Sequence, residues 1–121
     1  KNKIFFHNFV KDPFKKYGNK MDLICITSRF DGTPNVLGES MSYKIPCLAP
    51  KGVGLSNVLL KNGKYGYLYK SGDDLSFKNS IKYALKNYKI SIKKAELGYI
   101  SLDRFNKDNT LGKLRIALSK I

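Results

Sequence analysis

The chain is organised around one stretch, SRFDGTPNVLGESM, at residues 28–41. An apolar run ends just before this stretch, and a helix is predicted to begin inside it. Pro34 suits the first helical position, because proline has no N–H to leave unpaired there and its φ angle is already helical. Thr33 is then the predicted N-cap. Asp31 precedes the helix, and Glu39, eight residues later, falls in its second turn.

The start of this helix is a candidate site for an anion. The first N–H groups of a helix have no partner inside it, and the helix dipole adds partial positive charge. Carboxylates would repel an anion that they touched, but they accept hydrogen bonds from neutral hydroxyl groups beside it. Asp31 and Glu39 therefore suit a nucleotide-sugar better than a bare nucleotide. The residues alone fit equally well an alternative in which Asp31 caps a turn and Glu39 is a solvated helix residue.

Apolar runs alternate with helical patterns along the rest of the chain. Leu23 to Ile26 is apolar without alternation, which predicts a strand buried on both faces and hence a parallel sheet. Other short strands are predicted at residues 4–6, 45–49 and 66–69, and helices at residues 13–17, 56–60, 75–88, 92–103 and 109–120. This order indicates an α/β fold with a parallel sheet and flanking helices. Ligands of such sheets bind at the carboxyl ends of the strands, where residues 28–41 begin.

Composition is that of one globular domain. The chain has 121 residues, of which 42% are hydrophobic, and it begins with Lys1, so we expect a piece of a longer chain. No apolar run approaches the ~18 residues that cross a bilayer. Cys25 and Cys47 lie in separate apolar runs and are predicted to be reduced and buried, which fits a cytoplasmic protein. His7 is predicted to end a strand, and no metal-ligand spacing is present.

The net charge of +14 comes almost entirely from lysine. Such a charge favours an acidic partner: nucleic acid, an anionic membrane surface or a phosphorylated substrate. Abundant lysine, asparagine and isoleucine are also what the codons of an AT-rich genome encode most often. We give this codon bias about half of the weight as the explanation of the charge. Binding to an anionic membrane surface receives most of the remaining weight. Nucleic-acid binding receives little weight, because no strand surface combines basic and aromatic residues and no recognition helix is evident.

Four segments occur together in the order and spacing of a known family. They are residues 28–41, 45–46, 52–59 and 63–68, and residues 4–17 match the segment that precedes them. From about Lys3 to Tyr88 the chain resembles the carboxyl-terminal half of a family-4 (group 1) retaining glycosyltransferase of the GT-B class. The resemblance implies a partial Rossmann-like nucleotide-sugar-binding domain at residues 1–90, followed by C-terminal helices at residues 91–121.

The resemblance also implies a role for individual residues. Asp31, the implied catalytic residue, matches the first glutamate of the family's motif, which contacts hydroxyls of the transferred sugar. Glu39 matches the second, which holds the ribose. Phe9 and Val10 lie where family members often contact the base. The backbone around the helix start would meet the diphosphate or sugar, at Gly32, Pro34, Asn35, Val36 and Leu37. No metal or other cofactor is expected, since positive side chains and helix dipoles neutralise the diphosphate.

Several positions depart from the family pattern. Asp31 is one methylene shorter than glutamate, Asn57 replaces a common acid, and Asn8 replaces a common glycine. The family's phosphate-neutralising arginine and lysine, and its acceptor-binding amino-terminal domain, lie upstream of this sequence. We therefore expect that the chain alone does not turn over.

The function that the resemblance implies is transfer of a hexose from a UDP- or GDP-sugar to a glycan or lipid-linked acceptor, with retention. Such an enzyme would build a cell-surface polysaccharide or lipopolysaccharide, in the cytoplasm or as a peripheral protein at the inner membrane face. The alternatives are a non-catalytic sugar-nucleotide-binding or interaction fragment and, last, a nucleic-acid-binding domain.

Overall fold

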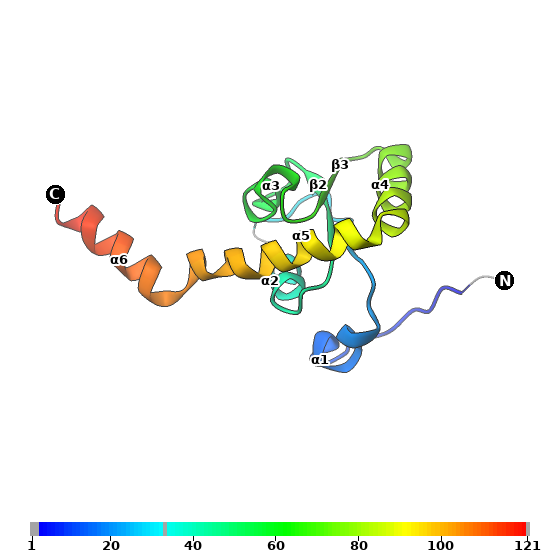
Figure 1. The fold of residues 1–121 in the computed structure, drawn as a ribbon, viewed down its shortest axis with the longest axis horizontal. Helices are drawn as coiled ribbons and strands as arrows, with labels where there is room; N and C mark the ends of the chain where they lie inside the picture. Colours follow the sequence, from blue (N-terminus) through cyan, green and yellow to red (C-terminus); the bar gives the residue numbers. More distant parts are fainter. Residues whose placement is uncertain (1–2, 33, 121) are drawn as a thin grey trace.

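The computed structural model describes residues 3–32 and 34–120. Its centre is a three-stranded parallel sheet in the order β1-β2-β3, with helices around it (Figure 1). The strands are β1 (Ile24–Cys25), β2 (Cys47–Lys51) and β3 (Tyr67–Lys70). The α-helices are α1 (Pro13–Tyr17), α2 (Asn35–Ser42), α3 (Ser56–Leu59), α4 (Asp74–Lys86), α5 (Tyr88–Ser101) and α6 (Lys107–Leu118). Short 3₁₀-helices are η1 (Gly18–Lys20), η2 (Lys61–Gly63) and η3 (Leu102–Phe105). The predicted α/β fold with a parallel sheet is confirmed.

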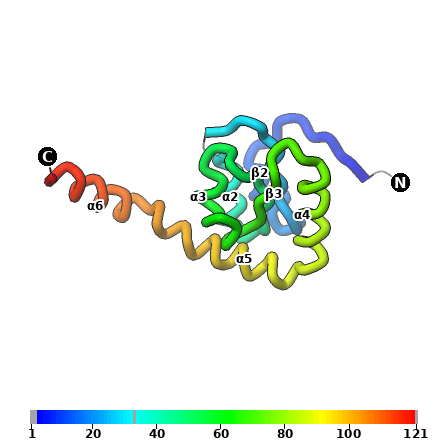
Figure 2. The backbone as a smooth tube through the Cα atoms, turned by 90° about the horizontal axis from the view of Figure 1, so that it is seen from above, coloured from blue at the N-terminus to red at the C-terminus, as the bar shows by residue number. Residues whose placement is uncertain are grey.

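The side chains of successive strand residues point to opposite faces of the sheet, and helices cover both faces. The first face meets α2 and α3 in one hydrophobic cluster, whose buried members are Ile26, Leu37, Met41, Cys47, Ala49, Leu59 and Leu60. The second face meets α4, where the ring centroids of Tyr69 and Phe77 are 4.9 Å apart. Figure 2 shows the sheet lying between α2 and α3 on one side and α4 on the other. Because strand side chains alternate, the face of any strand residue follows from its neighbours two positions away.

A proline in β2 lies where the pairing of β1 ends. The N–H of Ile26 donates to Leu48 O at 2.8 Å, so a continued parallel ladder would pair the N–H of residue 50 with Ile26 O. Pro50 has no N–H, and the hydroxyl of Tyr69 donates to Ile26 O instead, at 3.0 Å. Burial, and secondarily the nearby Cys25, raise the pKa of Tyr69, which keeps the hydroxyl protonated as a donor.

The predicted strand at residues 4–6 is absent, and that prediction is wrong. Ile4, Phe5 and Phe6 are 71%, 80% and 95% exposed, and the segment is extended without strand pairing. A strand is stable only when a neighbouring backbone satisfies its N–H and C=O groups, and no described segment pairs with this one. An apolar triplet indicates a tendency to be buried, but it does not indicate which segment would cover it.

Two predictions around residues 23–42 need correction. β1 is one of the two edge strands and its residues are half-buried, so the prediction that it is buried on both faces is wrong. The helix begins at Asn35, and Pro34 is its N-cap with an extended ψ of 93°, so Pro34 is not the first helical residue. The predicted N-cap Thr33 lies outside the described residues.

The carboxyl-terminal part is helical, as predicted. One continuous helix, α5, spans the predicted boundary between residues 90 and 91 and packs on α2, where a Cβ at Gly98 would lie 3.4 Å from Met41 Cε. The division into two domains stays a prediction. Beyond η3, α6 extends away from the sheet and exposes its apolar residues (Figure 1). None of the helices in the described residues combines the length and hydropathy of a bilayer-spanning segment.

Both cysteines are free, as predicted. Cys47 is buried on the α2 face of the sheet, and its thiol donates to Ile45 O at 3.1 Å. Burial raises the pKa of Cys47 to about 12. The predicted burial of Cys25 is wrong: this residue is only half-buried, because it lies on β1 at one edge of the sheet, and its partial burial raises its pKa also.

Candidate functional site at the carboxyl edge of the sheet

The parallel strands bring the segments that follow them to one edge of the sheet. The motif loop, defined as residues 27–32, follows β1. The glycine loop, residues 52–55, follows β2, and residues 71–73 connect β3 to α4. The amino end of α2 lies at the same edge, because α2 returns from the motif loop to the start of β2. The sequence-predicted site residues of the motif loop, Asp31 and Gly32, are therefore gathered at this edge with those around the first turns of α2, which are Pro34, Asn35, Val36, Leu37 and Glu39.

The motif loop and the glycine loop touch through their backbones. The N–H of Leu55 donates to Gly32 O at 3.2 Å. Gly54 has a positive φ of 51°, and a Cβ there would lie 2.2 Å from Asp31 O and 2.5 Å from Gly32 O. Only glycine permits this approach. The sequence suggested an ordinary loop here, so it missed that the second glycine holds the motif loop in place.

Asn57 closes the glycine loop. Its side-chain oxygen accepts a hydrogen bond from the N–H of Gly52 at 2.7 Å, and its amide nitrogen donates to Asn62 Oδ1 at 3.1 Å. A carboxylate could accept the first bond but could not donate the second. Asn57, which departs from the family pattern, therefore both closes the glycine loop and links it to η2.

Asp31 is half-buried in the motif loop, beside the glycine loop. Within the described residues its carboxylate has neither a hydrogen-bond donor nor a cation at ion-pair distance. The alternative in which Asp31 caps a turn therefore gains no support from these residues. Gly32 beside it is exposed, with its carbonyl engaged by Leu55.

Glu39 is exposed on α2 and borders two cavities. One, of about 410 Å³, lies between α2 and α1 and is lined by Asp12, Pro13, Phe14, Lys15, Glu39 and Tyr43. The other, of about 500 Å³, lies between α2, α3 and η3 and is lined by Pro34, Asn35, Gly38, Glu39, Leu55, Leu59, Leu102 and Phe105. Sequence reasoning missed the α1 and η3 walls, because they come from segments far from residues 28–41.

The remaining predicted contacts differ in exposure. Asn35 and Val36 are exposed at the start of α2, while the side chain of Leu37 is fully buried, so only its backbone could meet a ligand. Leu37 N–H already donates to Pro34 O at 2.9 Å. Phe9 is 93% exposed and Val10 is half-buried, and neither lines a cavity with Glu39. The structure brings α1, and not Phe9, next to Glu39.

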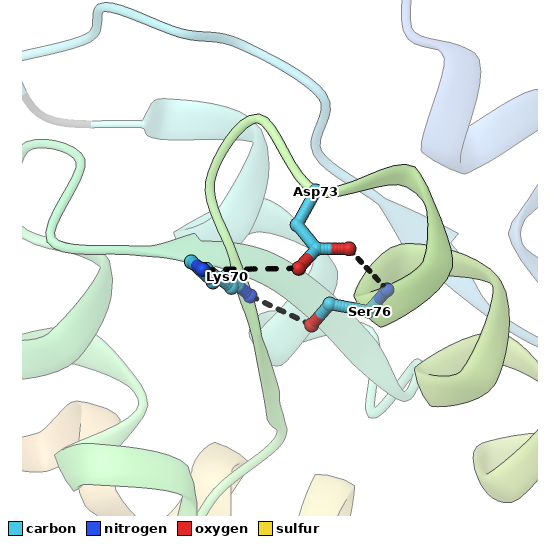
Figure 3. A network of polar contacts seen from close by, with 3 residues as sticks. All are labelled: Lys70, Asp73 and Ser76. Atoms are coloured by element: carbon cyan, nitrogen blue, oxygen red, sulfur yellow. Dashed lines mark hydrogen bonds and ion pairs between the residues drawn. The ribbon is translucent and has the colours of Figure 1, made fainter.

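A third cavity, of about 210 Å³, opens on the α4 side of the same edge. It is lined by Thr27, Ser28, Arg29, Tyr69, Ser71, Gly72, Asp73, Asp74 and Phe77. Figure 3 shows that Asp73 in this wall is the N-cap of α4: its carboxylate accepts from Ser76 N–H at 2.9 Å. Lys70 N–H donates to Ser76 Oγ at 2.9 Å, and Lys70 Nζ lies 4.0 Å from Asp73 Oδ2. The carboxylate of Asp73 therefore already makes structural contacts within the protein.

No metal centre is evident in residues 3–32 and 34–120, because no three His, Cys, Asp or Glu side chains lie close enough together to hold an ion. The expectation that the chemistry needs no metal stays a prediction. Without a metal, the positive charge that balances a bound anion would have to come from side chains and from the start of α2.

Comparison with solved structures identifies the fold. HepE of Anabaena, crystallised with UDP, has a TM-score of 0.70 and 24% identity, with 83% of this chain and 28% of HepE covered. Sucrose-phosphate synthase of Thermosynechococcus elongatus has a TM-score of 0.74 and 19% identity over 88% of this chain and 28% of the synthase. The C-terminal domain of the group 1 glycosyl transferase LpcC of Francisella tularensis has a TM-score of 0.70 and 20% identity over 81% of this chain and 51% of that domain.

The sequence comparisons identify the family. A search of curated proteins finds no match. The model of the family "Glycosyl transferases group 1" matches residues 1–100, which is most of the chain. The matched segment includes the motif loop, α2, the glycine loop and β3. The chain spans less than two thirds of each of the solved structures named above. The protein belongs to the group 1 glycosyl transferases.

Proposed function

We propose that this chain is the donor-binding part of a retaining hexosyltransferase. It would take a UDP- or GDP-sugar and serve transfer of the hexose to a hydroxyl of a glycan or lipid-linked acceptor. The observation that carries the proposal is the close backbone contact between the glycine loop and the motif loop beside the start of α2. That contact fixes Asp31 and the helix start at the carboxyl edge, where α/β folds bind nucleotides.

Asp31 would accept hydrogen bonds from hydroxyls of the transferred sugar, because its carboxylate has no partner within the described residues. The backbone at Gly32, Pro34, Asn35, Val36 and Leu37 would meet the diphosphate or sugar at the amino end of α2. Glu39 would hold the ribose. The cavity between α1 and α2, which Glu39 borders, would then take the ribose and the adjoining base. Phe9 and Val10, which do not line this cavity, would contact the base from outside it.

In the proposed reaction, the bond between the anomeric carbon and the diphosphate oxygen breaks, and its electron pair leaves with the nucleoside diphosphate. The acceptor oxygen bonds to the anomeric carbon from the same face, and its proton passes to the leaving nucleoside diphosphate. The chain's contribution is to stabilise the leaving diphosphate at α2 and to orient the sugar through Asp31. The solved HepE structures hold UDP and UDP-glucose, which supports this class of donor.

The acceptor, the product and the location extend the proposal further. An acceptor-binding domain outside this sequence would complete the enzyme, and the net charge of +14 suits a cytoplasmic protein at an anionic membrane face. The product would be a cell-surface polysaccharide or lipopolysaccharide. A non-catalytic sugar-nucleotide-binding fragment is the second candidate, favoured by the shorter Asp31 carboxylate.

Calorimetric titration of this chain with UDP, GDP and their hexose derivatives tests the proposal. Glu39→Ala should weaken binding of the preferred nucleotide by about 1.5–3 kcal/mol, because a charge-assisted hydrogen bond is lost. Glu96→Ala, an exposed glutamate on α5, is the matched control and should leave binding unchanged. If no nucleotide binds and the chain instead binds DNA in a salt-sensitive way, the transferase proposal is wrong.

Turnover separates the two candidates. If the complete protein binds a UDP- or GDP-sugar but transfers no hexose to an acceptor mixture, the non-catalytic fragment is favoured. Transfer with retention by the complete protein, lost in Asp31→Asn, would favour the enzyme.

A further inference from the structure

The last helix, α6, carries a leucine stripe that no described part of the chain covers. Leu111, Leu114 and Leu118 follow the spacing i, i+3 and i+7, which places them on one side of a helix. These residues are 40%, 52% and 59% exposed, and none of the residues of α6, all of which the structure describes, is buried. Figures 1 and 2 both show α6 extending away from the sheet, so the leucine stripe faces solvent.

Hydrogen bonds hold α6 in this direction. The guanidinium group of Arg104 in η3 donates to Val58 O at 3.1 Å and to Leu59 O at 2.8 Å, which ties η3 to the end of α3. Asn106 follows as the N-cap of α6, and its side-chain oxygen accepts a hydrogen bond from Asn109 N–H at 2.7 Å. The helix therefore projects from a structured joint and not from a frayed end.

The side of α6 that lies next to α3 is not the side of the leucine stripe. Thr110 and Lys113 line a cavity of about 260 Å³ together with Val58, Arg104 and Phe105. Successive residues of a helix are rotated by about 100°, so the leucine stripe lies about a quarter turn away from these two residues. Contact with α3 therefore leaves the stripe open.

The charges around the leucine stripe favour an anionic surface as its partner. Residues 107–120 carry four basic side chains and a single acidic one, that of Asp108. Lys107 lies in line with the stripe and Arg115 lies beside it, and both are exposed. A second copy of the chain on the stripe would bring together two proteins of net charge +14, which like-charge repulsion opposes. Helices with an apolar stripe and bordering basic residues lie in the interface of anionic membranes.

We propose that α6 lies on the surface of an anionic phospholipid bilayer, with the leucine stripe between the headgroups and the acyl chains. Lys107 and Arg115 would then contact the lipid phosphates. The helix has 12 residues, too few to span a bilayer, so its axis lies in the plane of the interface. α6 also lies beyond residues 1–100, which the family model matches, so this surface is separate from the donor site. Of the proposed function, the inference rests only on the placement at an anionic membrane face.

Co-sedimentation with lipid vesicles tests this inference. Vesicles of phosphatidylcholine with about a third phosphatidylglycerol should bind the chain at low salt, about tenfold or more tightly than vesicles of phosphatidylcholine alone. Leu114→Ala should lower this binding about five- to tenfold, because it removes apolar area from the stripe but keeps a strong helix former. Ile116→Ala is the matched control, since Ile116 is 60% exposed on the opposite side of α6, and its effect should stay below about twofold.

The charge is tested in the same way. Arg115→Gln should weaken binding to the anionic vesicles about three- to fivefold, whereas Lys82→Gln, an exposed lysine on α4, should change it less than about twofold. Circular dichroism and thermal unfolding check that each variant is folded and helical.

Three results would overturn this inference and leave the donor site standing. They are a lack of binding to both kinds of vesicle, equal losses from Leu114→Ala and Ile116→Ala, and a dimer of the unaltered chain that Leu114→Ala converts to a monomer. The last result would mean that a second copy covers the stripe. UDP affinity should be the same in Leu114→Ala and the unaltered chain. A chain that binds the anionic vesicles but no nucleotide would instead overturn the proposed donor site.

Discussion

Replacement of Gly54 by alanine should separate a steric effect from a conformational one. A Cβ at residue 54 would lie 2.2 Å from Asp31 O and 2.5 Å from Gly32 O, both backbone atoms that cannot rotate away. The two loops must therefore move apart, which breaks the hydrogen bond from Leu55 N–H to Gly32 O. The lost bond costs about 0.5–1.5 kcal/mol, and the left-handed backbone adds about 1–2 kcal/mol for a residue with a Cβ.

The expected loss for Gly54→Ala is therefore about 2–4 kcal/mol of unfolding free energy, with residual strain included. Gly52 provides the matched control, because its φ is also positive, at 78°, and a Cβ there would meet nothing within 4 Å. Gly52→Ala should lose only the conformational part, about 1–2 kcal/mol. Equilibrium urea unfolding of both variants measures the difference.

The Gly54→Ala variant should also shift the amide NMR signals of Asp31 and Gly32, which the Gly52→Ala variant should leave nearly unchanged. A UDP titration of both variants then tests whether the loop contact matters for binding. Equal destabilisation of the two variants, or unchanged signals at Asp31 and Gly32, would refute the reasoning that Gly54 positions the motif loop.

Two further outcomes concern α4 and the sheet. Asp73→Ala should lower the unfolding free energy by about 0.5–2 kcal/mol in urea titrations because it removes the cap bond to Ser76, whereas Asp74→Ala, in the exposed first turn, should cost less. Because burial raises the pKa of Cys47 from 9.0 to about 12, its stabilising contribution is complete below pH 9 and is lost as pH rises toward 12. Stability measured between pH 8 and 11 should therefore fall more steeply in the unaltered chain than in Cys47→Ala, and equal slopes would contradict the assignment.

Local signals were enough to predict the elements between residues 45 and 70. Ile45-Pro46 and the apolar residues after it predicted β2, although the strand both begins and ends two residues later than expected, at Cys47–Lys51. The Lys61-Asn62-Gly63 turn was readable because asparagine and glycine tolerate positive φ, and both adopt it here. Asp12-Pro13 likewise predicted α1, because proline suits the first turn of a helix.

Three of the failures share one physical cause, which is that burial and pairing depend on partners distant in sequence. The triplet at residues 4–6 has the composition of a strand, but composition does not say which backbone pairs with it. The contact of Gly54 with Asp31 joins segments more than twenty residues apart, so neither glycine in the loop signalled it alone. The α1 wall beside Glu39 was missed for the same reason.

The hydrogen bond from Tyr69 to Ile26 has an evolutionary consequence. A backbone donor is present at every residue but proline, so the end of a strand is usually indifferent to substitution. Here Pro50 removes the backbone donor, and a phenol two strands away replaces it. The position at which the motif loop leaves the sheet therefore depends on a hydrogen bond from a side chain, the hydroxyl of Tyr69. A single substitution at residue 69 would therefore alter the loop's departure, so selection can adjust the motif loop without changing any residue of that loop.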